Sequence, residues 1–296
     1  MRFGVQVSTA ACGMAEIREA WARVEALGYE WISGQDHFLT LRDPSAGSFE
    51  AVTTHAALAA LTTRPRVGCL VYSAGYRHPA VMANALATID HLSAGRLEVG
   101  MGAGWLQAEY DGYGIPFEAP AVRLRRLREA VVVTKALWSN ETTDLDGEFF
   151  QLRGARCDPK PVQDLPRIWI GAKGPHALRV AAEVGDGWNA NFIPAHDVAG
   201  KVEQVRELAP AGYAISATVP FVAAGDDDLD AVIDERYGAA ADTVRDAAVG
   251  GSVAQVTDRV GAFAAAGVDW LILAVRPPFE FEALERFAAE VRPRFS

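Results

Sequence analysis

Two neighbouring side chains, Asp36 and His37, follow an apolar segment that ends in Gly34. Histidine titrates near neutral pH, so His37 can give a proton to a substrate atom during a reaction. A pair at the carboxyl end of a parallel strand faces the mouth of a barrel, where active sites lie. The alternative is that Asp36 caps the following loop while His37 packs against Phe38. The first interpretation predicts an acid–base site after this strand.

Glycine-rich turns follow two further apolar segments. They are Gly102-Ala103-Gly104 and Gly171-Ala172-Lys173-Gly174. Glycine has no Cβ, so backbone N–H groups there can approach an anion closely, and a helix that begins at Pro175 adds its own N–H groups. We expect these turns to hold a phosphate, although glycines after strands also form ordinary turns. The chain lacks the strand–Gly-x-Gly-x-x-Gly–helix pattern of nicotinamide dinucleotide sites.

Strand-like and helical patterns alternate along the chain. Eight apolar segments predict strands at residues 3–7, 31–33, 66–72, 96–101, 168–170, 187–192, 214–222 and 270–275. Helical patterns lie between them at residues 15–27, 49–61, 79–91, 123–138, 175–183, 197–208 and 253–266. Strands that alternate with helices pair in parallel through right-handed crossovers. At this length the pattern predicts an α/β fold and favours a closed (β/α)8 TIM barrel over an open sheet.

Two stretches interrupt this alternation. Residues 139–167 contain Asp146-Gly147, which predicts a hairpin, and then a proline-rich segment. Residues 223–251 are rich in Asp and Ala and predict one or two extra helices. Neither stretch has enough apolar periodicity to form its own core. We therefore expect one domain over residues 1–296 with two insertions.

The composition is typical of a soluble globular protein. Half of the 296 residues are hydrophobic, and the net charge of −10 argues against nucleic acid as a partner. No apolar run is long enough to cross a membrane, and the N-terminus lacks a signal-peptide pattern. The three cysteines have no metal-ligand spacing and fit a reducing compartment. These features predict a cytoplasmic protein without a membrane, nucleic-acid or metal partner.

A series of short motifs resembles the bacterial luciferase-like monooxygenase family, specifically its branch that uses the deazaflavin coenzyme F420. The motifs occur in the family's order over most of residues 1–195, and include Gly34-Gln35-Asp36-His37-Phe38, Tyr76-Arg77-His78-Pro79, Asp90-His91-Leu92-Ser93, Gly100-Met101-Gly102-Ala103-Gly104-Trp105, Asp158-Pro159-Lys160-Pro161 and Gly185-Asp186-Gly187-Trp188-Asn189. The resemblance implies a (β/α)8 barrel, deazaflavin or flavin chemistry, and a homodimer.

The resemblance also implies how the centre of the site is built. It makes His37 a catalytic residue and places Asp36 against the cofactor ring, with a share in catalysis. It implies a non-proline cis peptide bond in the third strand, behind that ring. By position this bond is Cys69–Leu70, with Leu70–Val71 as the second possibility, so Cys69 and Leu70 are expected to contact the cofactor. Without a neighbouring base or cation, Cys69 is not expected to be a nucleophile.

Further contacts are expected around this centre. Both glycine turns and Asn189 (or Asn191) are expected to contact the cofactor. His78 is a second candidate for the cofactor tail, although capping of the following helix is its plainer role. Trp105 and Glu109 are expected beside the substrate, where Trp105 forms either an aromatic wall or part of a lid.

These observations favour one function over two others. The leading hypothesis is an oxidoreductase that transfers a hydride between coenzyme F420 and a small organic substrate, reducing a C=C or C=N bond. Sugar-phosphate dehydrogenases of this family have a glutamate where this chain has Trp105, which argues against sugar-phosphate oxidation. The alternatives are an FMN-dependent monooxygenase that uses reduced flavin and O2, and a flavin-binding barrel without catalysis. The presence of Asp36, His37 and both glycine turns disfavours the last.

Overall fold

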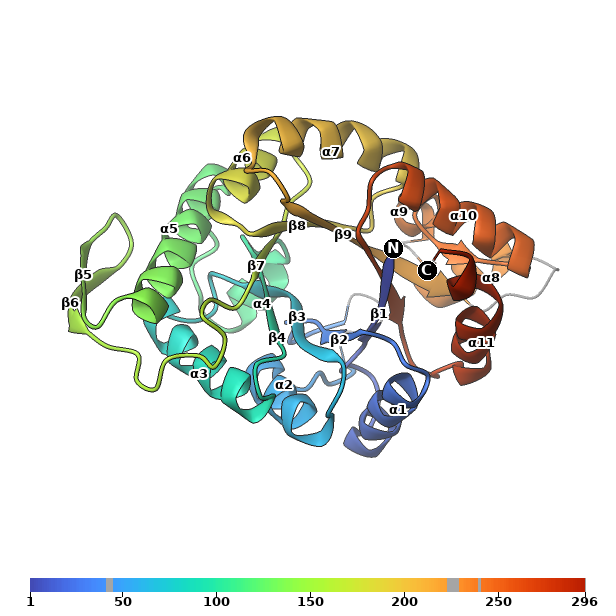
Figure 1. Cartoon of the computed structure of the whole chain (residues 1–296), viewed down its shortest axis with the longest axis horizontal. Coiled ribbons are helices and arrows are strands. Elements are labelled where there is room, and N and C mark those ends of the chain that lie inside the picture. The colour runs from blue at the N-terminus through green and yellow to red at the C-terminus, as the bar shows by residue number, and fades with distance from the viewer. Residues whose placement is uncertain (41–44, 223–228, 239–240, 296) are drawn as a thin grey trace.

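The computed structural model of the protein describes residues 1–40, 45–222, 229–238 and 241–295. Parallel strands form a closed barrel, because β8 and β9 pair and complete the ring (Figure 1). In order around the barrel the strands are β1 (Arg2–Val7), β2 (Trp31–Gly34), β3 (Arg66–Ser73), β4 (Leu97–Gly102), β7 (Ile168–Gly171), β8 (Gly187–Asn191), β9 (Ala214–Val222) and β11 (Trp270–Val275). This confirms the predicted (β/α)8 barrel.

The described residues form α-helices, most of which surround the barrel on its outside (Figure 1). They are α1 (Met14–Ala26), α2 (Ala51–Leu61), α3 (Pro79–Leu92), α4 (Gln107–Gly112), α5 (Pro120–Ser139), α6 (Pro175–Val184), α7 (Ala195–Leu208), α8 (Leu229–Tyr237), α9 (Ala241–Arg245), α10 (Val253–Ala265) and α11 (Phe281–Arg286). The sequence pattern did not predict α4 or α11, which are single short helices of six residues each. No helix among these is long and apolar enough to span a bilayer.

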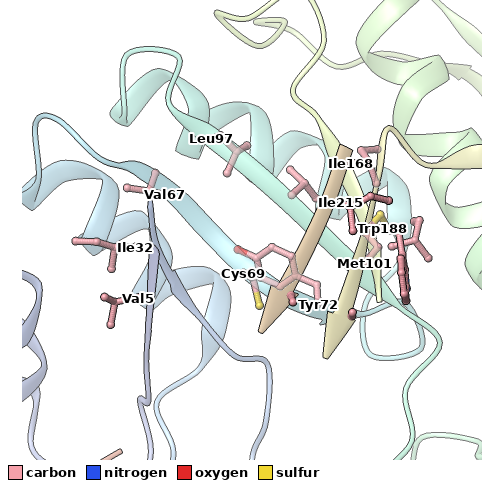
Figure 2. Packing of buried hydrophobic residues seen from close by; sticks show 14 of the residues in the cluster. Val5, Ile32, Val67, Cys69, Tyr72, Leu97, Met101, Ile168, Trp188 and Ile215 are labelled. Atoms are coloured by element: carbon pink, nitrogen blue, oxygen red, sulfur yellow. The ribbon is translucent and has the colours of Figure 1, made fainter. Parts of the chain in front are cut away.

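Buried side chains on both sides of the strands explain why the strands are apolar runs. Outward-facing residues such as Val5, Ile32 and Val67 pack in one large cluster with the helices (Figure 2). Successive strand residues point to opposite faces, so Trp31 points into the barrel. There its ring lies 5.4 Å from that of Trp169, measured between centroids. Aromatic rings therefore fill the amino-terminal half of the barrel interior, and the site must lie at the carboxyl end.

The two predicted insertions have their own secondary structure. Within residues 139–167, β5 (Thr143–Asp146) and β6 (Gln151–Ala155) pair as an antiparallel hairpin, which projects beyond α5 (Figure 1). Within residues 223–251 lie α8, α9 and the short β10 (Val249–Gly250), which pairs with β9 outside the barrel. Residues 223–228 and 239–240 of this insertion lie outside the described residues.

Candidate functional site

The imidazole of His37 lies beside the carboxylate of Glu109 at the carboxyl end of the barrel. His37 follows β2, and Glu109 belongs to α4, the short helix after β4. His37 Nδ1 is 3.0 Å from Glu109 Oε2, and the ring of Trp105 stands edge-on to His37 with centroids 5.7 Å apart. The side chain of His37 is 25% exposed and Trp105 is 58% exposed. Both rings are therefore open to a ligand.

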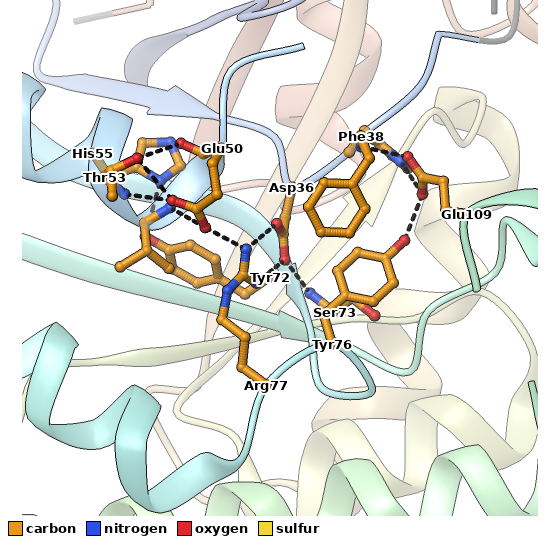
Figure 3. A network of polar contacts seen from close by, with 12 residues as sticks. Asp36, Phe38, Glu50, Thr53, His55, Tyr72, Ser73, Tyr76, Arg77 and Glu109 are labelled. Carbon is orange, nitrogen blue, oxygen red and sulfur yellow. Dashed lines mark hydrogen bonds and ion pairs between the residues drawn. The ribbon is translucent and has the colours of Figure 1, made fainter. Parts of the chain in front are cut away.

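Glu109 itself is closed to a ligand. Its side chain is fully buried, and the backbone N–H groups of Phe38 and Leu39 donate to Oε1 over 2.6 and 2.9 Å. The hydroxyl of Tyr76 donates to Oε2 over 2.5 Å (Figure 3). Burial by itself raises the pKa of Glu109, but the hydrogen bonds from His37 and Tyr76 outweigh burial and lower that pKa below its ordinary value. Protein donors thus meet both oxygens of Glu109, and its predicted contact with substrate stays a prediction.

Asp36 is likewise engaged with protein donors. The N–H of Ser73 donates to its Oδ2 over 2.9 Å, and Arg77 binds both carboxylate oxygens (Figure 3). The same guanidinium reaches Glu50, which also caps the N-terminus of α2. These contacts join the end of β2 to the loop after β3. The share in catalysis that the family resemblance implies for Asp36 stays a prediction.

The non-proline cis peptide bond expected in β3 lies at the second of the two predicted positions. It joins Leu70 to Val71, whereas the bond between Cys69 and Leu70, predicted first, is not cis. The register of β3 against β4 shifts between Cys69 and Tyr72 at this point. Gln6 of β1 donates a 2.7 Å hydrogen bond to the Leu70 carbonyl oxygen.

Cys69 is a packing residue in this structure. It is completely buried, and burial raises the pKa of its thiol well above the ordinary value. The thiol therefore stays protonated and is a poor nucleophile. Its predicted contact with a cofactor stays a prediction.

The glycines of the two turns have different structural roles. A Cβ on Gly104 would lie 1.9 Å from the hydroxyl of Tyr110, and the backbone φ there is +75°. A Cβ on Gly102 would lie 2.7 Å from a methyl group of Val71. Packing alone therefore requires both glycines of the first turn. A Cβ on Gly174 would meet nothing within 4 Å, and no side chain caps α6 at Gly174. The second turn is the one that leaves helix N–H groups open to an anion.

The remaining predicted cofactor contacts have protein partners. His78 is the N-cap of α3, and its Nδ1 accepts from the N–H of Ala80, which is the plainer of its two predicted roles. Asn189 is completely buried, and its amide donates to the hydroxyls of Ser216 and Thr218 over 3.0 Å each. Its side chain thus belongs to the barrel interior, where the neighbouring strand β9 already satisfies its amide.

Tyr76 and Arg77 belong to the candidate site, and the sequence patterns did not predict them there. Both belong to a motif that carried the family resemblance, yet neither received a role. Buried carboxylates need donors. Asp36 and Glu109 therefore signal that partners exist somewhere in the chain. Which donors meet them depends on the loops after β3 and β4, which only the folded barrel brings together.

Comparison with known proteins identifies the family. The protein-family model of the luciferase-like monooxygenases matches residues 1–239. The chain belongs to this family. A curated relative, the F420-dependent glucose-6-phosphate dehydrogenase of Amycolatopsis mediterranei (strain U-32), is 30% identical over 189 residues, or 64% of this chain and 56% of the relative. The chain thus matches little more than half the length of such relatives.

Solved structures share the fold over the whole chain. An F420-dependent secondary alcohol dehydrogenase in complex with an F420–acetone adduct has a TM-score of 0.88, with 20% identity and 98% of each chain covered. The FMN-bound oxygenating constituent of the 3,6-diketocamphane monooxygenase from Pseudomonas putida has a TM-score of 0.79 and 17% identity, and the match covers 100% of this chain and 99% of that one. At such identities the likeness concerns the fold.

Proposed function

We propose that the protein is an F420-dependent oxidoreductase that transfers a hydride between coenzyme F420 and a small organic substrate, reducing a C=C or C=N bond. The sequence relatives named as F420-dependent favour this cofactor. The observation that carries the proposal is the His37 ring, which is exposed at the barrel mouth, held by an ionised Glu109 and adjacent to the open face of Trp105. Such a group can supply the proton that must accompany a hydride.

The residues of the second glycine turn fit an anionic cofactor tail. The N-terminus of α6 presents N–H groups that its N-cap residue Gly174 does not cap, Gly174 leaves open space beside them, and Lys173 is an exposed cation. Trp188 fixes this turn by donating a 2.9 Å hydrogen bond to the carbonyl oxygen of Ala172. When bound, the deazaflavin would supply the hydride, while this chain holds its tail and provides the proton.

The substrate we propose is a neutral organic molecule rather than a sugar phosphate. Trp105 offers a flat apolar surface beside His37, which suits the body of an organic molecule. Arg77, a cation of the same rim, is already paired with Asp36 and Glu50. It is therefore not free to bind a substrate phosphate.

The second candidate is an FMN-dependent monooxygenase that uses reduced flavin and O2. The FMN-bound monooxygenase with the same barrel favours it. A quenching titration of the purified protein with each cofactor separates the two. We expect F420 to bind at least tenfold more tightly than FMN, a difference of about 1.4 kcal/mol. Equal or reversed affinities would favour the monooxygenase. Cofactor binding without turnover on any C=C or C=N substrate would favour a flavin-binding barrel without catalysis.

A substitution in the second glycine turn tests whether that turn binds the cofactor tail. Lys173→Met removes the exposed cation beside α6 and should weaken F420 binding. Lys201→Met, a change at a half-buried lysine of α7, provides the matched loss of one positive charge and should leave the affinity unchanged.

A further inference from the structure

We propose that Glu109 is a positioning residue that fixes which nitrogen of His37 carries the resident proton, meaning the hydrogen that stays on the ring throughout the reaction. Its consequence for turnover rests on the proposed function, but the placement of the proton does not. The geometry at Glu109 assigns the resident proton to Nδ1, so Nε2 is the nitrogen that exchanges a proton with substrate.

The argument begins with the two oxygens of Glu109. An ionised carboxylate only accepts hydrogen bonds. Oε1 faces two backbone donors, the N–H groups of Phe38 and Leu39, and Oε2 faces Tyr76 and Nδ1 of His37. Burial and the neighbouring Glu109 carboxylate raise the pKa of Tyr76, so its hydroxyl stays protonated and remains a donor. At 3.0 Å from an acceptor, Nδ1 must carry a hydrogen.

The second ring nitrogen has no such partner within the described part of the chain. Among the residues that the structure describes, none forms a hydrogen bond with His37 Nε2, and a quarter of the side chain is exposed. In the proposed reduction, the hydride adds to one atom of the double bond, and the Nε2 proton goes to the other atom. His37 is then left neutral, with its remaining proton on Nδ1 facing Glu109. The reverse reaction returns the proton to Nε2.

Glu109→Gln tests the assignment, because the two backbone donors dictate how the new amide sits. Its oxygen must occupy the place of Oε1, since an NH2 group there would face two N–H donors. The NH2 group then takes the place of Oε2 and donates toward His37. Nδ1 can accept that hydrogen bond only after losing its own hydrogen. We therefore expect the neutral ring to change from the Nδ1–H form to the Nε2–H form.

Nitrogen-15 NMR of histidine-labelled protein, without cofactor or substrate, measures this directly. The chain has six histidines, and His37→Gln identifies the relevant signals by their loss. We expect Nδ1–H in the wild type and Nε2–H in Glu109→Gln. Tyr76→Phe is the matched control, because it removes one donor from the same oxygen but keeps the carboxylate. That variant should keep Nδ1–H.

Turnover provides the second readout. Glu109→Gln should lower kcat by roughly 10²–10⁴-fold, because a ring whose Nδ1 accepts a hydrogen bond holds only one proton and would become an imidazolate on giving it to the substrate. The KM and the F420 affinity should change little. A Glu109→Gln protein that stays folded and keeps Nδ1–H overturns the proposal. Failure of the wild type to bind F420 instead refutes the proposed function and leaves the NMR result standing.

Discussion

Asp36 and Arg77 form a bidentate ion pair across the ends of adjacent barrel strands. Nη1 of the guanidinium lies 2.7 Å from Oδ2 of the carboxylate, and Nη2 lies 2.9 Å from Oδ1. The Asp36 side chain is almost completely buried. The pair fixes the start of the segment that carries His37, so it couples the stability of the barrel to the geometry of the proposed acid.

Breaking this pair should be costly. Arg77→Met leaves the Asp36 carboxylate buried without a cation, and loss of one partner of a buried pair typically costs about 3–5 kcal/mol of unfolding free energy. Denaturant unfolding monitored by circular dichroism measures it. Arg125→Met, which breaks the exposed ion pair between Arg125 of α5 and Glu148 of the β5–β6 hairpin, is the control and should leave the stability nearly unchanged. Similar losses in both variants would show that Asp36 does not depend on Arg77.

Turnover should depend on His37 as an acid. His37→Ala is expected to lower turnover by roughly 10²–10⁴-fold, the usual contribution of general acid catalysis. Binding of F420 should change far less, because both glycine turns remain. His37→Gln keeps a hydrogen-bond donor but cannot titrate, and we expect a similar loss. Near wild-type turnover in the glutamine variant would mean that the proton comes from elsewhere, and a collapse of cofactor affinity would make His37 a cofactor contact.

Stability should fall in acid because of His55. This histidine is completely buried against the Tyr72 hydroxyl, and burial lowers its pKa from 6.5 to about 3. The unfolded chain takes up a proton below pH 6.5 that the folded chain does not. The unfolding free energy therefore decreases as the pH falls from 6.5 toward 3, with His55 contributing about 1.4 kcal/mol per pH unit.

The His55 contribution can be isolated by substitution. His55→Gln should make the dependence of unfolding free energy on pH shallower over this range. His196→Gln alters an exposed histidine of α7 and should leave the slope as in the wild type. If the unfolding free energies of His55→Gln and of the wild type have the same pH dependence, the folded protein must protonate this buried ring as readily as the unfolded chain does.

We expect two copies of the chain to associate through α3 and α5. Exposed apolar side chains on these helices include Val81, Leu92 and Val132, with Val81 68% exposed. Trp138, Val131 and Val133 of α5 are buried within the fold and do not contribute to this surface. Light scattering at micromolar concentration should report a dimer, and Val81→Glu should shift it toward a monomer. A monomeric wild type would contradict this expectation.

Local sequence patterns were enough to predict the barrel. A strand buried on both faces must be a short apolar run, and a helix that covers it must repeat its apolar positions every three to four residues. Both patterns are local, so they predict all eight barrel strands without any knowledge of contacts between distant residues. The same patterns placed His37 and the glycine turns at strand ends, and therefore at one end of the barrel.

Tertiary structure alone decided which groups meet there. His37 and Glu109 are 72 residues apart in the chain, and Asp36 and Arg77 are 41 apart. A hydrogen bond depends on the distance and direction between two side chains, and those are set only when barrel closure brings the loops after β2, β3 and β4 together. For the same reason the sequence could propose a phosphate role for Gly104, but only the packed Tyr110 hydroxyl showed that the fold itself requires glycine at that position.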